Sequence, residues 1–274
     1  MKNSYQFIHL ETYAIKPQKK SNRPSAEAVA RECQRIENSY PHITDPKDAE
    51  LLYGIQPLEA VSKIKKLVST MRDPLGRKLR QDSQVIACGV VSIGTESSPE
   101  NWASEKVVNW VKDTELFLKN RFGESFVSLN KHVDEQFCHL HFTLIPKITD
   151  NKLDLNSFHP GLAAQRTCKT SKKSSKDHAY KEAMRAFQDE YFNAVGLKNG
   201  QLRYGPRRRR LSRSEWHAQK RYAQNISNLF NEKNKLISSL NSKLEYAKNI
   251  LAKVFPSKFS PPNSSKDKNK EPSL

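Results

Sequence analysis

Two strand-like segments joined by a very short connection constrain the fold of this chain most. SFVSLNKHV (residues 125–133) and HLHFTLIP (residues 139–146) are separated by only five residues. Strands joined so tightly pair antiparallel, because a parallel pairing needs a long crossover. QVIACGVVSIG (residues 84–94) is a near-continuous apolar segment, which is typical of a central strand buried on both faces. Together these segments predict a mainly antiparallel sheet.

The other periodic segments supply helices and one more strand. Residues 4–14 alternate as a strand, with Tyr5, Phe7, His9 and Glu11 on one side. Helical patterns are present at residues 25–37, 57–71, 99–121 and 177–196. Turn-forming residues indicate loops at residues 40–54 and 166–181. The order of elements predicts an α+β fold with helices on one face of the sheet.

A heptad repeat marks the C-terminal part of the chain. Its positions are Ile226, Phe230, Lys233, Ile237, Leu240, Leu244, Ala247, Leu251 and Val254. Steps of four and three favour an exposed coiled coil, and hence a homodimer, over a helix packed on its own domain. We therefore expect a main domain at residues 1–200, a basic linker at 201–222, the coiled-coil helix at 223–255 and a disordered tail at 256–274.

The charge of the chain indicates a polyanionic partner. The formal net charge is +18 over 274 residues, which favours nucleic acid first and an anionic membrane surface second. No apolar segment approaches the ~20 residues of a membrane helix, so stable membrane insertion is not expected. The four cysteines show no CxxC pair and the first residues do not resemble a signal peptide, which together predict a cytoplasmic protein.

The strand pattern places three histidines close together. His139 and His141 are two residues apart, so both point to one face of their strand. A hairpin brings His132 opposite them, and Asp134 and Glu135 lie in the connection. Three neutral imidazoles with open coordination positions suit Mn, Zn, Fe or Ni, whereas Mg usually prefers oxygen ligands. The alternative is an ordinary strand that carries histidines.

The same residues resemble a known motif. H-x-D-E-x-x-x-H-x-H, followed by an apolar run and Pro146, is similar to the third motif of the Pre/Mob (MobV-type) plasmid mobilisation relaxases, which are HUH endonucleases. Leu140 is the hydrophobic residue between the histidines. Supporting similarities occur in Ser4-Tyr5, VARECQRIENSYPHI, PKDAELLYG, FHPG, AYKEAMRAFQDEYF and GPRRRRLSRSEW. The resemblance covers about residues 3–217.

This resemblance implies a relaxase that nicks one DNA strand at a plasmid origin of transfer or recombination, holds the DNA end covalently and rejoins it. It implies a metal held by His132, His139 and His141 with Glu135 in support, most often Mn, with Mg as the second candidate. Tyr53 corresponds to a DNA-contacting tyrosine of the family, and Arg35 to an arginine of its nucleophile segment.

The chain also departs from the family pattern. Glu32 stands where some members have a histidine nucleophile, so Glu32 is the nucleophile, a base or an ordinary solvated helix residue, and Tyr40 and Tyr5 are the alternative nucleophiles. The second motif's His and Asn are absent. Two other readings therefore stay open: a non-catalytic DNA-binding protein with a structural metal, and an HUH replication initiator or transposase.

Basic segments indicate where plasmid DNA, single-stranded and duplex, would bind. One contains Arg207, Arg208, Arg209 and Arg210, with Tyr204, Trp216 and Tyr222 interleaved. Lysines are also concentrated near residues 16–20 and 169–176. Phosphate contacts would supply most of the affinity, and aromatic rings can stack on unpaired bases. The alternative for the arginine run is a linker whose aromatics pack on the main domain.

Overall fold

A computed structural model describes residues 4–17, 23–40, 43, 45–73, 75–205 and 213–254. The chain separates into two compact units, residues 1–227 and 228–274. Arg207–Arg210 and the predicted tail at 256–274 lie outside the described residues. Among the described residues, no helix is both long and apolar enough to cross a membrane.

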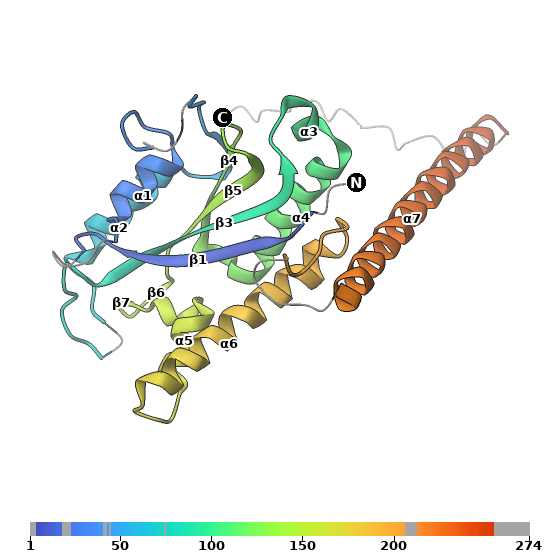
Figure 1. Cartoon of the computed structure of the whole chain (residues 1–274). Helices are drawn as coiled ribbons and strands as arrows, with labels where there is room; N and C mark the ends of the chain where they lie inside the picture. Colours follow the sequence, from blue (N-terminus) through green and yellow to red (C-terminus); the bar gives the residue numbers. More distant parts are fainter. Residues whose placement is uncertain are drawn as a thin grey trace, which may run out of the picture. The chain divides into compact units, whose positions relative to one another are not determined.

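The first unit is built on a five-stranded antiparallel sheet (Figure 1). Its strands lie in the order β1-β3-β5-β4-β2, and their bounds are β1 Phe7–Ala14, β2 Glu50–Gly54, β3 Gln84–Glu96, β4 Phe126–His132 and β5 Phe137–Leu144. The predicted hairpin is confirmed, because β4 and β5 pair antiparallel along their length. The near-continuous apolar strand is also confirmed: β3 lies between β1 and β5, and its residues at 85–89 are all buried.

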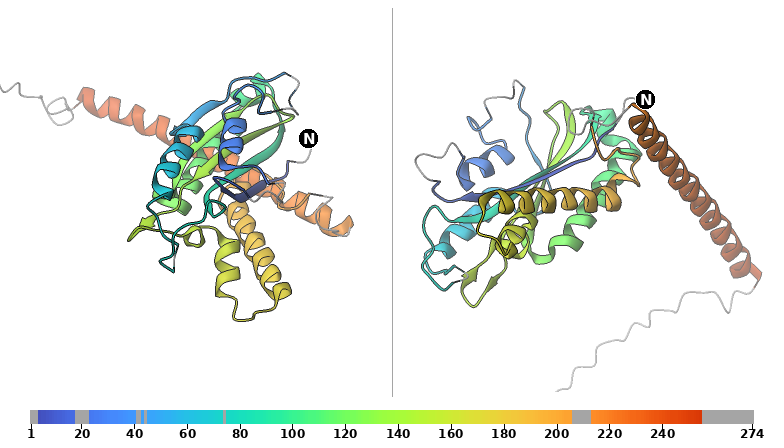
Figure 2. Two further views of the ribbon diagram at one scale, coloured as in Figure 1. Left: turned by 90° about the vertical axis from the view of Figure 1, so that its left-hand side faces the viewer. Right: turned by 60° about the horizontal axis from the view of Figure 1, so that its bottom comes forward.

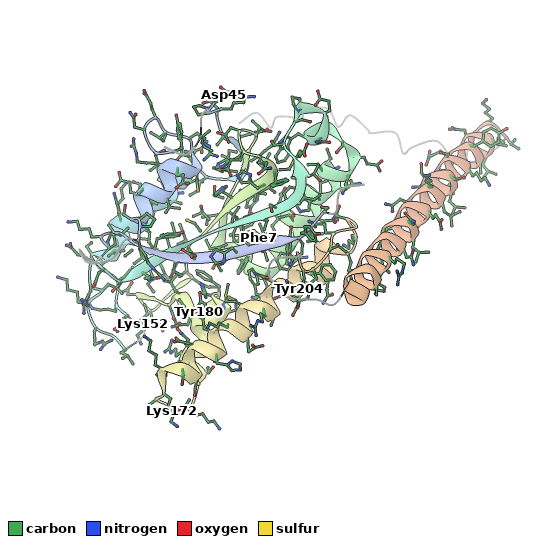
Figure 3. All side chains as sticks on the ribbon, in the orientation of Figure 1. Phe7, Asp45, Lys152, Lys172, Tyr180 and Tyr204 are labelled. Atoms are coloured by element: carbon green, nitrogen blue, oxygen red, sulfur yellow. The ribbon has the colours of Figure 1, made fainter. Side chains whose placement is uncertain are left out.

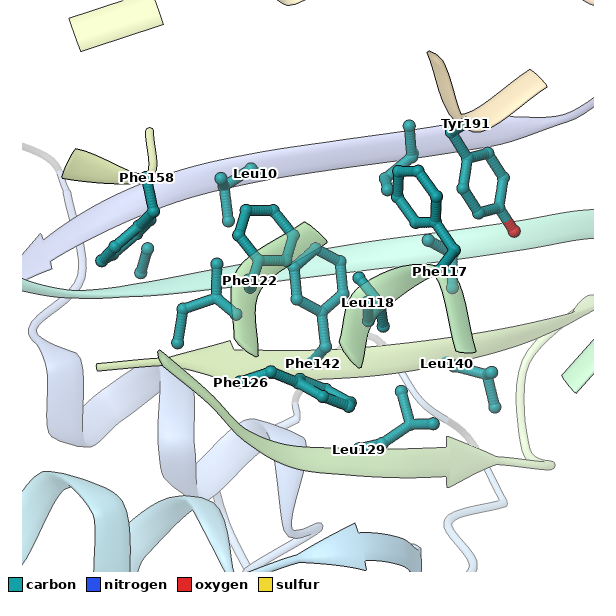
Figure 4. Packing of buried hydrophobic residues seen from close by; sticks show 14 of the residues in the cluster. Leu10, Phe117, Leu118, Phe122, Phe126, Leu129, Leu140, Phe142, Phe158 and Tyr191 are labelled. Atoms are coloured by element: carbon teal, nitrogen blue, oxygen red, sulfur yellow. The ribbon is translucent and has the colours of Figure 1, made fainter. Parts of the chain in front are cut away.

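The first face of the sheet carries the main hydrophobic core. Leu10 of β1, Leu129 of β4 and Phe142 of β5 project from this face into a cluster rich in phenylalanine (Figure 4). The helical segments around it are α3 Pro99–Ala103, α4 Glu105–Phe122, η1 Gly123–Ser125, η2 Leu155–Ser157, α5 Pro160–Thr167, α6 Lys173–Tyr191 and the π-helical η3 Phe192–Gly196. A short hairpin, β6 Ile148–Thr149 and β7 Lys152–Leu153, precedes η2.

Helices also cover the second face, so the prediction of helices on one face only is wrong. α1 Ala26–Cys33 and α2 Pro57–Val68 pack there against Ile86 and Cys88 of β3 (Figure 2). The reason lies in the central strand: Val85 and Ala87 join the main core, whereas the alternate residues face α1 and α2. A strand that is apolar on both faces requires cover on both.

Several element boundaries differ from the predictions. Part of the expected loop at 40–54 is the edge strand β2, which pairs with β4. The expected helix at 99–121 is interrupted at Ser104, whose side chain caps α4 by accepting a hydrogen bond from Val107 N. α1 ends at Cys33 rather than near residue 37, because Arg35 adopts a left-handed φ of 55°.

The basic segment at 166–181 is mostly helical instead of a loop. It contains the end of α5 and the start of α6, and Lys172 lies at the turn between them (Figure 3). Lys169, Lys172 and Lys173 are exposed there. Because α6 packs on the main core through Phe187 and Tyr191, these lysines lie at the turn between two helices of the first face, with only Lys173 inside α6.

The heptad segment forms one long helix, α7 Arg213–Val254. In the second unit, the seam residues Ile237, Leu240, Leu244 and Leu251 are all at least 40% exposed. A helix is therefore present over the heptad segment, but it begins at Arg213, within the segment expected to be a linker, and the coiled coil stays a prediction.

Tyr191 gives a test of the main core. Its buried hydroxyl accepts a hydrogen bond from Trp110 Nε1 at 3.0 Å and lies 2.9 Å from Thr114 Oγ1. We expect Tyr191→Phe to lower the free energy of unfolding by about 1–3 kcal/mol, because the Trp110 N–H loses its partner away from water. Urea denaturation measures this. Tyr246→Phe, on an exposed residue of α7, is the control and should change little.

Candidate metal centre

Three histidines converge beside the connection of the β4–β5 hairpin, on the second face of the sheet. His132 pairs directly with His139, and His141 pairs with Asn130, one step further along the strands. The ring centroids are 4.3 to 5.2 Å apart. Glu135, from the connection, completes a group of four side chains whose ligand atoms lie within 4.8 Å of one another. The predicted clustering is thus found.

Hydrogen bonds to backbone carbonyls set the tautomers of two of these histidines. His132 Nε2 lies 2.7 Å from Cys33 O, and His139 Nδ1 lies 2.9 Å from Phe137 O. A carbonyl oxygen only accepts, so each of these nitrogens carries the proton of its neutral ring. The other two nitrogens, His132 Nδ1 and His139 Nε2, therefore present lone pairs to each other at 3.3 Å.

This arrangement fits a shared cation. Two lone pairs that face each other across 3.3 Å repel unless a positive charge lies between them. Zinc–nitrogen bonds of about 2.0–2.1 Å at a tetrahedral angle, for example, place two ligating nitrogens about 3.3 Å apart. Glu135 Oε1, at 3.3 Å from His139 Nε2, adds a carboxylate to the same space. His132, His139, His141 and Glu135 are accordingly the residues that would hold a divalent metal.

The environment keeps His132 and His141 neutral. Burial, followed by the positive charge of Arg35, lowers the pKa of His132 to about 4. Loss of water around the ring, followed by the neighbouring His132 and His139, places the pKa of His141 well below its ordinary value. Imidazoles that are unprotonated near neutral pH can donate to a metal without first losing a proton.

Arg35 connects the end of α1 to the hairpin connection. Its Nε and Nη2 donate to the two oxygens of Asp134 at 2.8 and 2.9 Å, and Nη2 also donates to Glu135 Oε1 at 2.8 Å. Nη1 donates to the carbonyl of Glu32 at 3.2 Å. Burial alone would raise the pKa of Asp134, but hydrogen bonds from Arg35 and from Lys47 N hold it below its ordinary value. Arg35 thus holds Glu135 beside the histidines.

The nucleophile candidates lie at different distances from this centre. Glu32 is in the last turn of α1, half-buried, and its carboxylate is not one of the four clustered groups. The Tyr40 ring lies 6.0 Å from the guanidinium carbon of Arg35. Tyr5 lies just before β1, at the opposite edge of the sheet from β2, and forms a bridge with Leu202.

Tyr53 lies on the other face of the sheet. In β2 it pairs with Leu129, whose side chain points into the main core, whereas His132 points to the second face. The Tyr53 ring stacks on Phe126 at 4.8 Å, and Lys119 Nζ of α4 lies 4.2 Å from its centroid. The structure does not bring Tyr53 to the histidines.

Cys33 is a site residue that the sequence interpretation missed. Its carbonyl accepts from His132, and its Sγ lies 3.4 Å from His141 Nδ1. No local pattern marks it, since it precedes His132 by 99 residues and sits in a helix as a single cysteine.

Comparisons with known proteins identify the family. The model of the plasmid recombination enzyme family, Mob_Pre, matches residues 47–223. A solved structure of the MobM relaxase domain bound to 26-nucleotide pMV158 oriT DNA is 13% identical, with a TM-score of 0.45, and the match covers 76% of this chain and 95% of that one. A Mn-bound MobM structure at pH 6.8 gives 13% identity and a TM-score of 0.47, over 78% and 98%. No curated protein matches significantly. Since the family match spans more than half of the 274 residues, the chain belongs to the plasmid recombination enzyme family.

Proposed function

We propose that this plasmid recombination enzyme nicks one strand at a plasmid origin of transfer or recombination and later rejoins it, with a divalent metal bound by His132, His139 and His141. The pair of imidazole lone pairs that face each other at 3.3 Å carries the metal assignment. All three histidines lie inside the matched range 47–223. Mn is the proposed metal, as the resemblance to the relaxases implies, and Mg is the second candidate, since Mg usually prefers oxygen ligands and this cluster offers three nitrogens.

The chemistry proposed is transesterification at phosphorus. A divalent cation at this centre would supply positive charge against the scissile phosphate oxygens. His132 and His141, which burial keeps neutral, need not lose a charge-bearing proton to bind it, and Arg35 holds the Glu135 carboxylate in place at 2.8 Å. The attacking oxygen forms a bond to phosphorus while the bond from phosphorus to the leaving deoxyribose oxygen breaks, so the DNA end stays attached to the protein.

Glu32 is the first candidate for the attacking group. Two main-chain hydrogen bonds hold its segment beside the histidines. The Glu32 carbonyl accepts a hydrogen bond from Arg35, and the Cys33 carbonyl accepts one from His132. A carboxylate that attacks phosphorus forms a mixed anhydride, which water can cleave, whereas Tyr40 or Tyr5 would form a stable phosphodiester. These three residues precede the matched range, so the proposal on the nucleophile rests on their placement alone.

We also propose contacts with DNA outside the metal centre. The net charge of +18 supports phosphate binding by basic segments, among them Arg207–Arg210. Tyr53 would contact DNA at the β2 edge of the first face, beside Lys119, and not within the metal centre.

The apolar seam of α7 supports a parallel proposal, that two copies of the chain associate. Leu240 and Leu244 are each more than half exposed, and they continue a heptad pattern along the helix. Heptad positions of this kind pack into the holes of a partner helix, which makes a second copy of α7 the natural occupant.

Metal binding is tested by titrating Mn into the purified chain under calorimetry. We expect His139→Ala and His141→Ala each to abolish measurable binding, because each removes a nitrogen from the cluster. His178→Ala is the matched control, since His178 lies exposed on α6 and should bind Mn as the wild type does. If His139→Ala and His141→Ala both bound Mn with wild-type affinity, the metal assignment would be wrong.

Strand cleavage is tested with Mn, a supercoiled plasmid that carries the origin, and a labelled origin oligonucleotide. Wild type should nick the plasmid and leave a covalent adduct, and His139→Ala and His141→Ala should do neither. We expect Glu32→Gln to lose the adduct and Tyr40→Phe and Tyr5→Phe to keep it. Neutral hydroxylamine should release an acyl phosphate adduct. An adduct that resists hydroxylamine and disappears in Tyr40→Phe or Tyr5→Phe would assign the attack to that tyrosine instead.

Association through α7 is tested by light scattering on the full chain. The wild type should have the mass of two chains. The double variant Leu240→Lys, Leu244→Lys should have the mass of one chain, because the lysines remove apolar contacts from the seam and their like charges repel each other. Leu236→Lys is the control: this leucine is also more than half exposed on α7 but is not one of the seam residues. A monomeric wild type would contradict the proposal.

A further inference from the structure

Cys33 touches two of the three clustered histidines with two different groups. It is the last residue of α1 and is almost fully buried. Its backbone carbonyl lies 2.7 Å from His132 Nε2, and its sulfur lies 3.4 Å from His141 Nδ1. The carbonyl is present whatever residue stands at this position, so the contact to His141 is the one that depends on the cysteine side chain.

The contact to sulfur bears on the tautomer of His141. A neutral imidazole carries one proton, and a metal can use only the nitrogen that lacks it. With Nδ1 facing the sulfur, Nε2 is the nitrogen left for a cation. Nε2 has a lone pair only when Nδ1 carries the proton and donates it to the Cys33 sulfur. In the reverse tautomer, Nε2 carries a proton and cannot bind a cation.

We propose that the Cys33 side chain is a positioning residue of the metal centre: its sulfur accepts the hydrogen bond from His141 Nδ1 and so keeps Nε2 of that ring free to bind the metal. This inference rests on the proposed metal-dependent function and adds to it a specific residue outside the ligand set. Partners of metal-bound histidines act in this way because they fix the ring's orientation and its tautomer.

For the other two histidines, main-chain carbonyls accept the corresponding hydrogen bond. His132 donates to Cys33 O and His139 donates to Phe137 O, so both outer nitrogens have strong acceptors. For His141, the corresponding neighbour is the side-chain sulfur of Cys33. Among the three rings, His141 is therefore the one whose tautomer a side-chain substitution can change.

A packing role for Cys33 needs a separate control, since Cys33 also lies in a small apolar cluster with Val29 and Cys88. Cys88 supplies that control. It is buried in the same cluster, and its sulfur lies 4.0 Å from Thr143 Oγ1 instead of a histidine. Cys88→Ala thus removes similar apolar contacts without touching the metal centre.

The experiment uses the full chain as wild type, Cys33→Ala, Cys33→Ser and Cys88→Ala. Mn affinity is measured by calorimetry, and the symmetry of the bound ion by the electron paramagnetic resonance spectrum of Mn(II). We expect Cys33→Ala to weaken binding about 10–100-fold and to alter the spectrum. Cys33→Ser should retain most of the affinity, because a hydroxyl oxygen also accepts an N–H hydrogen bond. Cys88→Ala should bind as the wild type does.

Two results overturn the inference while leaving the metal-dependent function intact: wild-type affinity and spectrum in Cys33→Ala, or an equal loss in Cys88→Ala. An equal loss in Cys33→Ser and Cys33→Ala, with Cys88→Ala unchanged, would also overturn it, since the acceptor would then not matter. A wild-type chain that binds no Mn overturns the metal-dependent function and this inference together, so the two failures are distinguishable.

Discussion

The ion pair between Arg35 and Asp134 is the interaction on which the site depends. Both side chains are essentially buried, with 1% and 0% exposed, and two parallel hydrogen bonds join them. Removal of one partner from a buried pair typically costs about 3–5 kcal/mol, because the remaining charge stays buried without its counterion. This pair fixes the end of α1 against the connection between β4 and β5. The Cys33 carbonyl and the Glu135 carboxylate reach the histidines because both ends are fixed.

The two faces of the sheet carry different kinds of residue, because successive side chains of a strand point to opposite faces. Along β5, Leu140 and Phe142 enter the aromatic core, whereas His139 and His141 face the other way. The histidines thus stand on strands that are held rigid from behind by a large apolar cluster. The second face is covered by two helices, α1 and α2, and the histidines lie on this face beside the end of α1.

Sequence patterns predicted those parts of the structure that depend on neighbouring residues. The hairpin follows from a short connection, and the clustering of His132 with His139 and His141 follows from strand periodicity. β2 was missed because five residues among turn formers carry little signal, and its pairing with β4 decides its conformation. The placement of Tyr53 on the far face and the contacts of Cys33 and Arg35 also escaped prediction, because they join residues far apart in the chain.

The shortness of α1 has a thermodynamic consequence. A helix of eight residues is unstable by itself, so α1 persists through its contacts with α2, with β3 and with the metal centre. Its last residue accepts the hydrogen bond that prepares His132 for a cation. Any ligand that favours the folded form of α1 stabilises it by mass action, and the coupling is reciprocal. Local unfolding of α1 and release of a cation from the proposed site would therefore be linked equilibria, and occupancy of that site would govern how often the segment that carries Glu32 opens.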